Sequence, residues 1–261
     1  MINIKSDEYR NFLKKCCNWD SIETVFLSFD VDWAPDFMLF DLMEILSNTK
    51  ATFMHTHKSK GVDECIKNFS AGTHPNLSPG SDQGNSIEEI INFFNENKLQ
   101  NFALNRFHVL GFSYPDLVKL SKAGLKLDSS TLLFNQHHIA PNYNQALDLI
   151  SVPYFWEDGV RLTHKPNHKE YSINLIDPGC KVLDFHPIDI YLNTYSMEQR
   201  NTFKKSFKSV IDATEAETEK FVNKKFYGTR DILIDLLKNR KNGIFEIQDL
   251  DFLNKYTREV I

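Results

Sequence analysis

One feature constrains the fold of this chain more than any other: apolar runs rich in β-branched residues alternate with segments of helical spacing. Each run is bounded by polar, glycine or proline residues, so we predict a strand at each. The predicted strands are 24–31, 51–57, 102–107, 149–155, 181–186 and 244–247. The predicted helices among them are 37–47, 86–97 and 115–122. Strands that alternate with helices pair in parallel through crossovers, so the sequence predicts an α/β sheet or barrel.

Local signals mark where two of these helices begin. Ser86 is followed three residues later by Glu89, and this pair forms a capping box in which each side chain satisfies a backbone N–H of the first turn. Pro115 falls in the first turn of a predicted helix, where backbone N–H groups have no partner within the helix, so its missing N–H loses no hydrogen bond. Both signals support the predicted starts of the helices.

The segment 196–240 differs in composition from the rest of the chain, because it contains a long charged stretch. We predict a long helix that begins at Ser196, with Gln199 as its capping-box partner, and that exposes its charged side chains to solvent. The chain shows no internal repeat, low-complexity tract or linker. We therefore predict a single domain over 1–261, in which 196–228 is a candidate helical insertion.

Composition limits the classes of partner. The 261 residues are 41% apolar and 13% aromatic, which is enough for one sizeable core. A formal charge of -5 argues against binding to nucleic acid or to an anionic membrane. The chain has no apolar run of membrane-spanning length and none of signal-peptide length near its start, so we expect a cytoplasmic protein without a membrane span. Its four cysteines, Cys16, Cys17, Cys65 and Cys180, include no C-x-x-C, so we expect reduced, structural cysteines.

Two carboxylates end the first predicted strand. The run "FLSFDVDWAPDF" carries Asp30 and Asp32 at the point where its apolar character stops. Residues two apart in a strand face the same side, and two like charges that close require a cation or a shared proton. A divalent metal explains them most simply; the alternative is that both acids cap the helix that follows Pro35.

Polar, chemically able side chains follow the other predicted strands as well. The carboxyl ends of parallel strands meet at one opening, where the functional groups of such folds collect. These side chains are His74 in the loop "SAGTHPNLSPG" after the second predicted strand, Arg106 and His108 in "NRFHVLGF", Asp128 in "KLDSS", Glu157 and Asp158 in "PYFWEDG", and His186 in "DFHPIDIYLNT". One such group is ordinarily structural, but their joint occurrence predicts a site.

In the same order along the chain, these residues resemble the motifs of the polysaccharide deacetylases of the NodB-homology type, carbohydrate esterase family 4. The matching stretches are "SFDVD", "HPNLS", "RFH", "LDSS" with "PYFWED", and "LDFHP". "HPN" together with "FHPIDIYLNT" and "PYFWED" resembles the divergent WbmS-like branch, which is found among surface-polysaccharide biosynthesis proteins. The resemblance spans about residues 24 to 195 and implies an irregular (β/α) barrel of the NodB-homology type.

The resemblance also implies an activity, namely metal-dependent hydrolysis of an N-acyl amide, N-acetyl in the first place. The expected partner is a sugar, a nucleotide-sugar or a polysaccharide precursor. By this resemblance Asp30 is the general base, Asp32 and His74 are metal ligands, Arg106 orients Asp30, and His186 is the general acid. The residues expected to tune the acid are Asp128 or the pair Glu157 and Asp158.

One position departs from the family pattern. The second histidine of the metal-binding loop is replaced by Ser78, so the usual set of one aspartate and two histidines is incomplete. A third ligand could come from Asn76, from His108 or from water, and His108 is favoured because imidazole suits zinc better than an amide. We expect a divalent metal, zinc first, with cobalt or nickel as alternatives.

Two other functions compete with this prediction. "HTH" at 55–57 places His55 and His57 two apart at a strand end, as in the metal sites of amidohydrolase-type barrels. The other alternative is a catalytically degenerate NodB-like carbohydrate-binding protein that keeps a sugar groove, with Trp33, Tyr154 and Trp156 as stacking platforms. For the deacetylase itself, we expect substrate contacts from five residues, which are Trp33, Asn76, Trp156, Glu157 and Asp158.

Overall fold

The computed structural model of this chain describes residues 25–97, 103–164, 173, 175–176, 178–239 and 243–250. These residues contain one ten-stranded sheet with the order β6-β7-β5-β4-β3-β2-β1-β9-β8, and β10 pairs with β1 beside this path. The strands are β1 (Val25–Asp30), β2 (Thr52–His55), β3 (Ser70–Thr73), β4 (Leu104–Asn105), β5 (Leu127–Asp128), β6 (Asn142–Asn144), β7 (Leu149–Ser151), β8 (Trp156–Glu157), β9 (Val182–Phe185) and β10 (Ile244–Phe245). Every pairing is parallel except that of β6 with β7.

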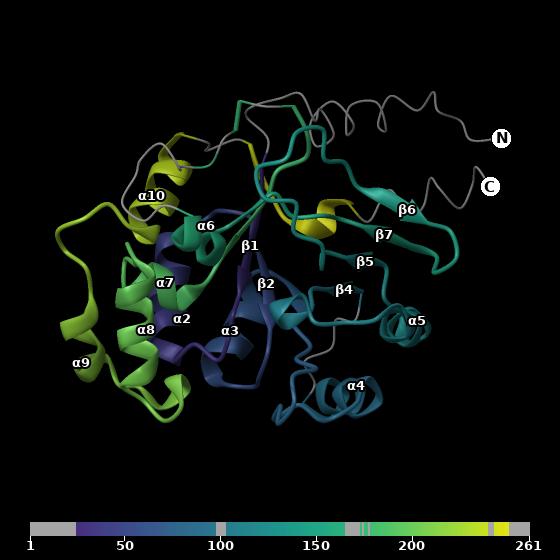
Figure 1. Cartoon of the computed structure of the whole chain (residues 1–261), viewed down its shortest axis with the longest axis horizontal. Helices are drawn as coiled ribbons and strands as arrows, with labels where there is room; N and C mark the ends of the chain where they lie inside the picture. The colour runs from purple at the N-terminus through teal and green to yellow at the C-terminus, as the bar shows by residue number, and fades with distance from the viewer. Residues whose placement is uncertain are drawn as a thin grey trace.

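Helices flank the curled sheet (Figure 1). The α-helices are α2 (Asp36–Ile45), α3 (Lys60–Asn68), α4 (Ile87–Glu96), α5 (Tyr114–Ala123), α6 (Asp158–His164), α7 (Pro187–Tyr191), α8 (Met197–Lys205), α9 (Glu215–Thr218) and α10 (Thr229–Asn239). Strands and helices alternate, and the two ends of the sheet path, β6 and β8, are not joined to each other. The predicted irregular (β/α) barrel is therefore confirmed, in a form whose sheet stays open.

Strand β1 explains how the site is positioned. All six of its residues are buried, so both faces of the strand are covered. Leu27 and Phe29 point to the cluster that the helices complete, whereas Phe26 belongs to the cluster on the other face of the sheet. Because side chains alternate along a strand, Ser28 and Asp30 share the face of Phe26. The strand thus carries two polar side chains on its inner face.

The predicted strand positions are confirmed, but several elements escaped prediction. Four further strands, β3, β5, β6 and β8, join the sheet, and helix α3 lies between β2 and β3. β3 has the sequence "SAGT", whose small residues give no apolar run. β5 and β8 are two residues long, which is too short for alternation to be visible. Tertiary pairing, and not local propensity, makes these segments strands.

The helix starts at Ser86 and near Pro115 are confirmed. The Ser86 hydroxyl accepts a hydrogen bond from the Glu89 N–H at the start of α4, and Pro115 lies in the first turn of α5. The predicted cap at Ser196 is also present, because its hydroxyl accepts from the Gln199 N–H.

The prediction that a long helix begins at Ser196 is wrong in the length of the helix. Helix α8 ends at Lys205, and the chain turns so that the rings of Phe207 and Phe221 pack against Phe203. Burying this aromatic cluster requires a reversal of the chain that a continuous helix does not permit. A second cap at Thr214 then begins α9. The single domain over 1–261 with its insertion at 196–228 stays a prediction.

Two further expectations concern cysteines and membranes. Cys65 and Cys180 are buried in the two faces of the core, whereas Cys16 and Cys17 lie outside the described residues. Within the part of the chain that the structure describes, no helix combines the length and the apolar character that a bilayer span requires.

Candidate active site

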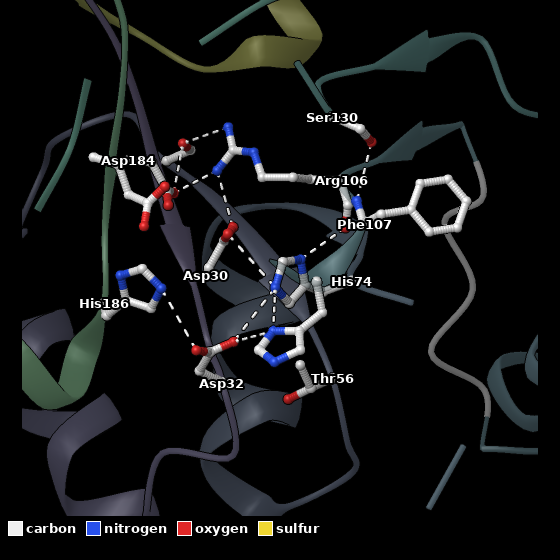
Figure 2. Close-up of polar contacts among 12 residues, drawn as sticks. Asp30, Asp32, Thr56, His74, Arg106, Phe107, Ser130, Asp184 and His186 are labelled. Atoms are coloured by element: carbon white, nitrogen blue, oxygen red, sulfur yellow. Dashed lines mark hydrogen bonds and ion pairs between the residues drawn. The ribbon is translucent and has the colours of Figure 1, made fainter. Parts of the chain in front are cut away.

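Side chains from several strand ends meet in one cavity of about 240 Å³ (Figure 2). Asp30 is the last residue of β1, His74 follows β3 directly, and His186 follows β9 directly. His108 and Asp32 come from the loops after β4 and β1. All five line the cavity. The parallel sheet therefore brings together the side chains that the sequence placed at successive strand ends.

Arg106 is the residue that holds the carboxylate of Asp30 in place. It follows β4 and is fully buried, and its Nη1 donates to Asp30 Oδ1 at 2.9 Å. Its other donors reach Ser28 Oγ at 3.0 Å and the Ser129 carbonyl at 3.1 Å, and its guanidinium lies 4.4 Å from the centre of the Tyr154 ring. Burial by itself raises the pKa of Asp30, but the charge of Arg106 and the nearby imidazoles outweigh it and hold this pKa below its usual range. The contact that was predicted between Arg106 and Asp30 is thus present.

Asp184 is a member of this group that sequence reasoning missed. It lies in β9 and is fully buried, and its Oδ1 accepts hydrogen bonds from Arg106 Nη1 and from Ser28 Oγ. Burial, with the charge of Asp30 added, raises the pKa of Asp184 well above its usual range against the pull of Arg106. A signal existed: Asp184 is a carboxylate inside an apolar strand, two residues before His186 and hence on the same face.

Asp32 reaches the cavity through a turn of unusual backbone geometry. Strand β1 ends at Asp30, and Asp32 and Trp33 then adopt φ values of 47° and 55°. Two consecutive non-glycine residues in the left-handed region are strained, and such strain persists only where the surroundings impose it. Here the Trp33 N–H donates to Thr56 Oγ1 at 3.1 Å. The prediction that both carboxylates face one site is confirmed, although a turn, and not an extended strand, achieves it.

Two imidazoles face the carboxylate of Asp32. Its Oδ1 lies 2.9 Å from His108 Nδ1 and 3.4 Å from His74 Nε2, and the two rings approach each other to 3.2 Å between these nitrogens. His74 Nδ1 donates to the Arg106 carbonyl at 2.7 Å, which directs Nε2 into the cavity. Burial raises the pKa of Asp32, but the adjacent His108 and His74 outweigh it and hold that pKa well below its usual range.

This group fits a divalent metal. One atom each from Asp32, His74 and His108 lie within 4.8 Å of one another. Asp32 Oδ1 is buried and accepts no hydrogen bond within the described residues, so a cation would satisfy it. A carboxylate with two imidazoles, one of which has its outer nitrogen bound to a carbonyl, is a donor set typical of zinc. Asn76 is not among the residues that line the cavity, and its Oδ1 accepts from the Ser78 N–H.

His186 stands on the other side of Asp32. Its Nδ1 lies 2.6 Å from Asp158 Oδ1, and its backbone N–H donates to Asp158 Oδ2 at 2.8 Å. Its Nε2 faces the cavity, 3.5 Å from Asp32 Oδ2. Burial lowers the pKa of His186, but the charge and the hydrogen bond of Asp158 outweigh it and raise this pKa well above the ordinary value.

Of the three carboxyl groups predicted to tune His186, Asp158 is the one that contacts it. The expectation for Asp128 is wrong, because Asp128 Oδ1 accepts from Ser130 Oγ and Asn105 Nδ2, 2.6 Å and 3.1 Å away. Ser130 Oγ also accepts from the Phe107 N–H, so this group supports the loop that carries His108. The expectation fails because β5 and β8 lie at opposite sides of β1 in the sheet.

Of the residues predicted to contact substrate, only some lie at the cavity. Glu157 lines the cavity and accepts from the Tyr154 hydroxyl at 3.2 Å. Trp156 is fully buried and packs on Phe185 at 4.9 Å between ring centres, so its prediction as a stacking platform is wrong: side chains alternate along β8 and this one faces the core.

Three further substrate candidates lie outside the cavity wall. Trp33 packs edge-on against His108 and donates from Nε1 to Asp82 at 2.9 Å. Asn76 is occupied in its own loop, and Asp158 is fully buried against His186. None of these three is among the residues that line the cavity. Trp33 and Asp158 instead contact His108 and His186, which do line the cavity.

His55 and His57 do not form the alternative metal centre. Neither belongs to a group of potential ligands within the described residues. His55 is buried without a hydrogen bond on either ring nitrogen, and this burial lowers its pKa to about 3. His57 Nδ1 lies 2.9 Å from Thr56 Oγ1. The amidohydrolase alternative therefore lacks its central feature.

Comparison with known proteins gave matches to polysaccharide deacetylases. Residues 27–204 match the family model described as "WbmS-like: Polysaccharide deacetylase". A crystal structure of WbmS from Bordetella bronchiseptica, described as a proposed polysaccharide deacetylase involved in O-antigen biosynthesis, is similar with a TM-score of 0.71 and 26% identity. The match covers 83% of this chain and 91% of that one.

A second solved structure shares the fold at lower identity. It is a proposed polysaccharide deacetylase from Mycobacterium smegmatis, with a TM-score of 0.53 and 13% identity over 92% of this chain and 93% of that one. A search of curated proteins found no match.

Proposed function

Because the chain belongs to the WbmS-like polysaccharide deacetylase family, we propose that it is a metal-dependent hydrolase that removes an N-acyl group, N-acetyl in the first place, from a sugar or polysaccharide precursor. One observation carries the proposal. A carboxylate paired with a buried arginine and a histidine paired with a buried carboxylate stand on either side of the group formed by Asp32, His74 and His108, in a single cavity.

The residues that would hold the metal are Asp32, His74 and His108, with zinc as the metal first expected. When bound, the metal would supply Lewis acidity that polarises the acyl carbonyl and makes water a stronger acid. His108 takes the place that Ser78 leaves open in the family pattern. It does so from the loop after β4 and not from the loop after β3.

Asp30 is assigned as the general base. Its Oδ1 is held by Arg106, while Oδ2 lies 3.5 Å from His74 Nε2 at the cavity wall. The pKa of Asp30 is held below its usual range by Arg106 and the imidazoles against burial, so the carboxylate is ionised at neutral pH. Oδ2 can then accept the proton of a water molecule that attacks the acyl carbon.

His186 is assigned as the general acid. Asp158 holds the Nδ1 side of the ring, so the proton available to substrate is the one on Nε2. Because Asp158 raises the pKa of His186 well above the ordinary value, Nε2 carries this proton at neutral pH. Its transfer to the departing nitrogen gives a neutral amine, while Asp30 retains the proton from water.

Acetate release tests the proposal. The purified chain, loaded in turn with zinc, cobalt or nickel, is incubated with N-acetylated sugars, sugar phosphates and nucleotide-sugars, and acetate is quantified. We expect release from at least one substrate, which chelation stops and which added metal restores. Stoichiometric sugar binding without acetate from any of them would instead support the carbohydrate-binding alternative.

A further inference from the structure

Two basic side chains of α8 reach the cavity that contains the proposed catalytic residues. Arg200 and Lys204 line it together with His186 and Asp30. They are four residues apart on one helix, so they lie on the same face, one turn from each other. Neither residue belongs to the proposed acid, base or metal ligands.

Arg200 is held in position by buried groups. Its Nε lies 3.1 Å from Oδ2 of Asp189, which is fully buried in α7, and the Arg200 side chain is 13% exposed. Glycine at 159 leaves room for it, because a Cβ there would come within 2.8 Å of Arg200 Nη1. One edge of the guanidinium is therefore occupied by Asp189, and the group stays at the cavity wall.

Lys204 lacks such a partner. Among the described residues, no carboxylate comes within 4.0 Å of its Nζ. Its neighbour Lys205 is exposed and does not line the cavity. A neutral N-acetyl sugar carries no charge to pair with the Lys204 ammonium and the Arg200 guanidinium. A phosphate or carboxylate group would pair with both.

Resting on the function proposed above, we propose that Arg200 and Lys204 form an anion subsite, so that the N-acylated substrate carries a phosphate or a carboxylate near the ring that bears the amide. The phosphate would be that of a sugar phosphate or nucleotide-sugar, and the carboxylate that of a uronic acid. The shared chemistry is a compact anion at the cavity wall formed by α8.

Calorimetric binding to the zinc-loaded full chain tests this subsite. The probes are N-acetylglucosamine 1-phosphate, N-acetylglucosaminuronic acid and the neutral methyl glycoside of N-acetylglucosamine. We expect at least one charged sugar to bind about tenfold more tightly than the neutral one, with an advantage that shrinks as salt rises. The charged sugar that shows the advantage identifies the source of the anion.

Lys204→Gln, with Lys205→Gln as the matched control, locates the effect. Removal of Arg200 would leave Asp189 buried and unpaired, so Lys204 is the position to change. Lys204→Gln should abolish most of the roughly tenfold advantage and leave the neutral sugar unaffected, and Lys205→Gln should retain it. Equal binding of charged and neutral sugars by the wild type, or equal effects of the two variants, would overturn the subsite.

The outcomes separate this inference from the proposed activity. Charged sugars that bind with the expected loss in Lys204→Gln, yet release no acetate, leave the subsite standing and refute the deacetylase. Acetate released equally well from charged and neutral sugars, with Lys204→Gln without effect, refutes the subsite and leaves the deacetylase standing.

Discussion

Asp30 and Asp32 are two residues apart, yet they lie in opposite kinds of surroundings. Asp30 ends a regular buried strand, and its Oδ1 is held by Arg106, which also binds Asp184 and Ser28. Asp32 lies in a left-handed turn, and its Oδ1 accepts no hydrogen bond within the described residues while two imidazoles face it. The difference teaches that the described residues satisfy the Asp30 carboxylate by themselves, whereas Asp32 Oδ1 is left for the proposed cation.

The same contrast extends to the loops. The Asp30 group rests on regular strands: β1 and β9, which pair with each other, and β4, which Arg106 follows directly. The Asp32 group rests on loops, and beside His108 the residues Val109 and Leu110 also have positive φ, 47° and 55°. Val109 is β-branched and 70% exposed, so its backbone strain is imposed by the loop and not offset by burial of its side chain. Binding of a metal by Asp32 and His108 is the interaction that would offset the free-energy cost of this backbone strain.

The largest effect is expected from Asp30→Asn, which removes the base and keeps its shape. We expect kcat/KM to fall about 10²- to 10⁴-fold, because general-base catalysis contributes on that scale. Metal content, measured by atomic emission, should stay at the wild-type level, since Asp30 is assigned no ligand role. Activity retained at the wild-type level would remove Asp30 from the mechanism.

Arg106→Met tests whether the Asp30 group is held by the arginine. The variant leaves Asp30 and Asp184 buried beside each other without their shared cation, so we expect a loss of about 3–5 kcal/mol in the free energy of unfolding. Urea denaturation of the metal-free protein measures it. The control is Arg230→Gln, which breaks a half-buried ion pair with Asp41 at the molecule's edge and should cost no more than about 1 kcal/mol.

His108→Ala tests the other half of the comparison. We expect zinc affinity to fall by at least about tenfold, measured by competition with a chromophoric chelator, because imidazole is lost from the ligand group. Stability of the metal-free chain should be unchanged or raised, since a strained loop is released from one constraint. Ser78→Ala is the matched control, and unaltered zinc affinity in His108→Ala would refute the proposed third ligand.

The smallest effect concerns the pH dependence of the His186–Asp158 pair. Asp158 outweighs burial and raises the pKa of His186, so the charged imidazole is favoured in the folded state. The resulting stability is fully present below the ordinary histidine value of about 6.5 and is lost as pH rises through the folded pKa. NMR titration of the metal-free chain should place this pKa above 6.5 and should find it lower in Asp158→Asn. Identical titration of the two proteins would contradict the pair's assigned role.

Several features followed from the sequence because they depend on local periodicity. Apolar runs identified β1, β2, β4, β7, β9 and β10, and the polar residues after them identified most side chains of the site; His74 was found in the loop after β2, although it follows the unpredicted β3. β3 and β5 escaped because "SAGT" and a two-residue strand carry no pattern of their own. The long helix predicted from Ser196 is wrong because the charged composition of this segment conceals the packing of Phe203, Phe207 and Phe221.

The sequence by itself determined the α/β architecture, the carboxylates at the end of β1 and the order of the motifs, because strand and helix periods are properties of the local chain. Only the tertiary structure decided that His108 and not Asn76 faces Asp32, that Asp158 and not Asp128 holds His186, and that Trp156 is buried in the core. Which residue reaches which partner depends on the order of the strands in the sheet and on the loop residues with left-handed backbone geometry. Residues of the same chemical type therefore differ in whether they reach the site, because β9, which precedes His186, pairs with β1 although most of the chain separates the two strands.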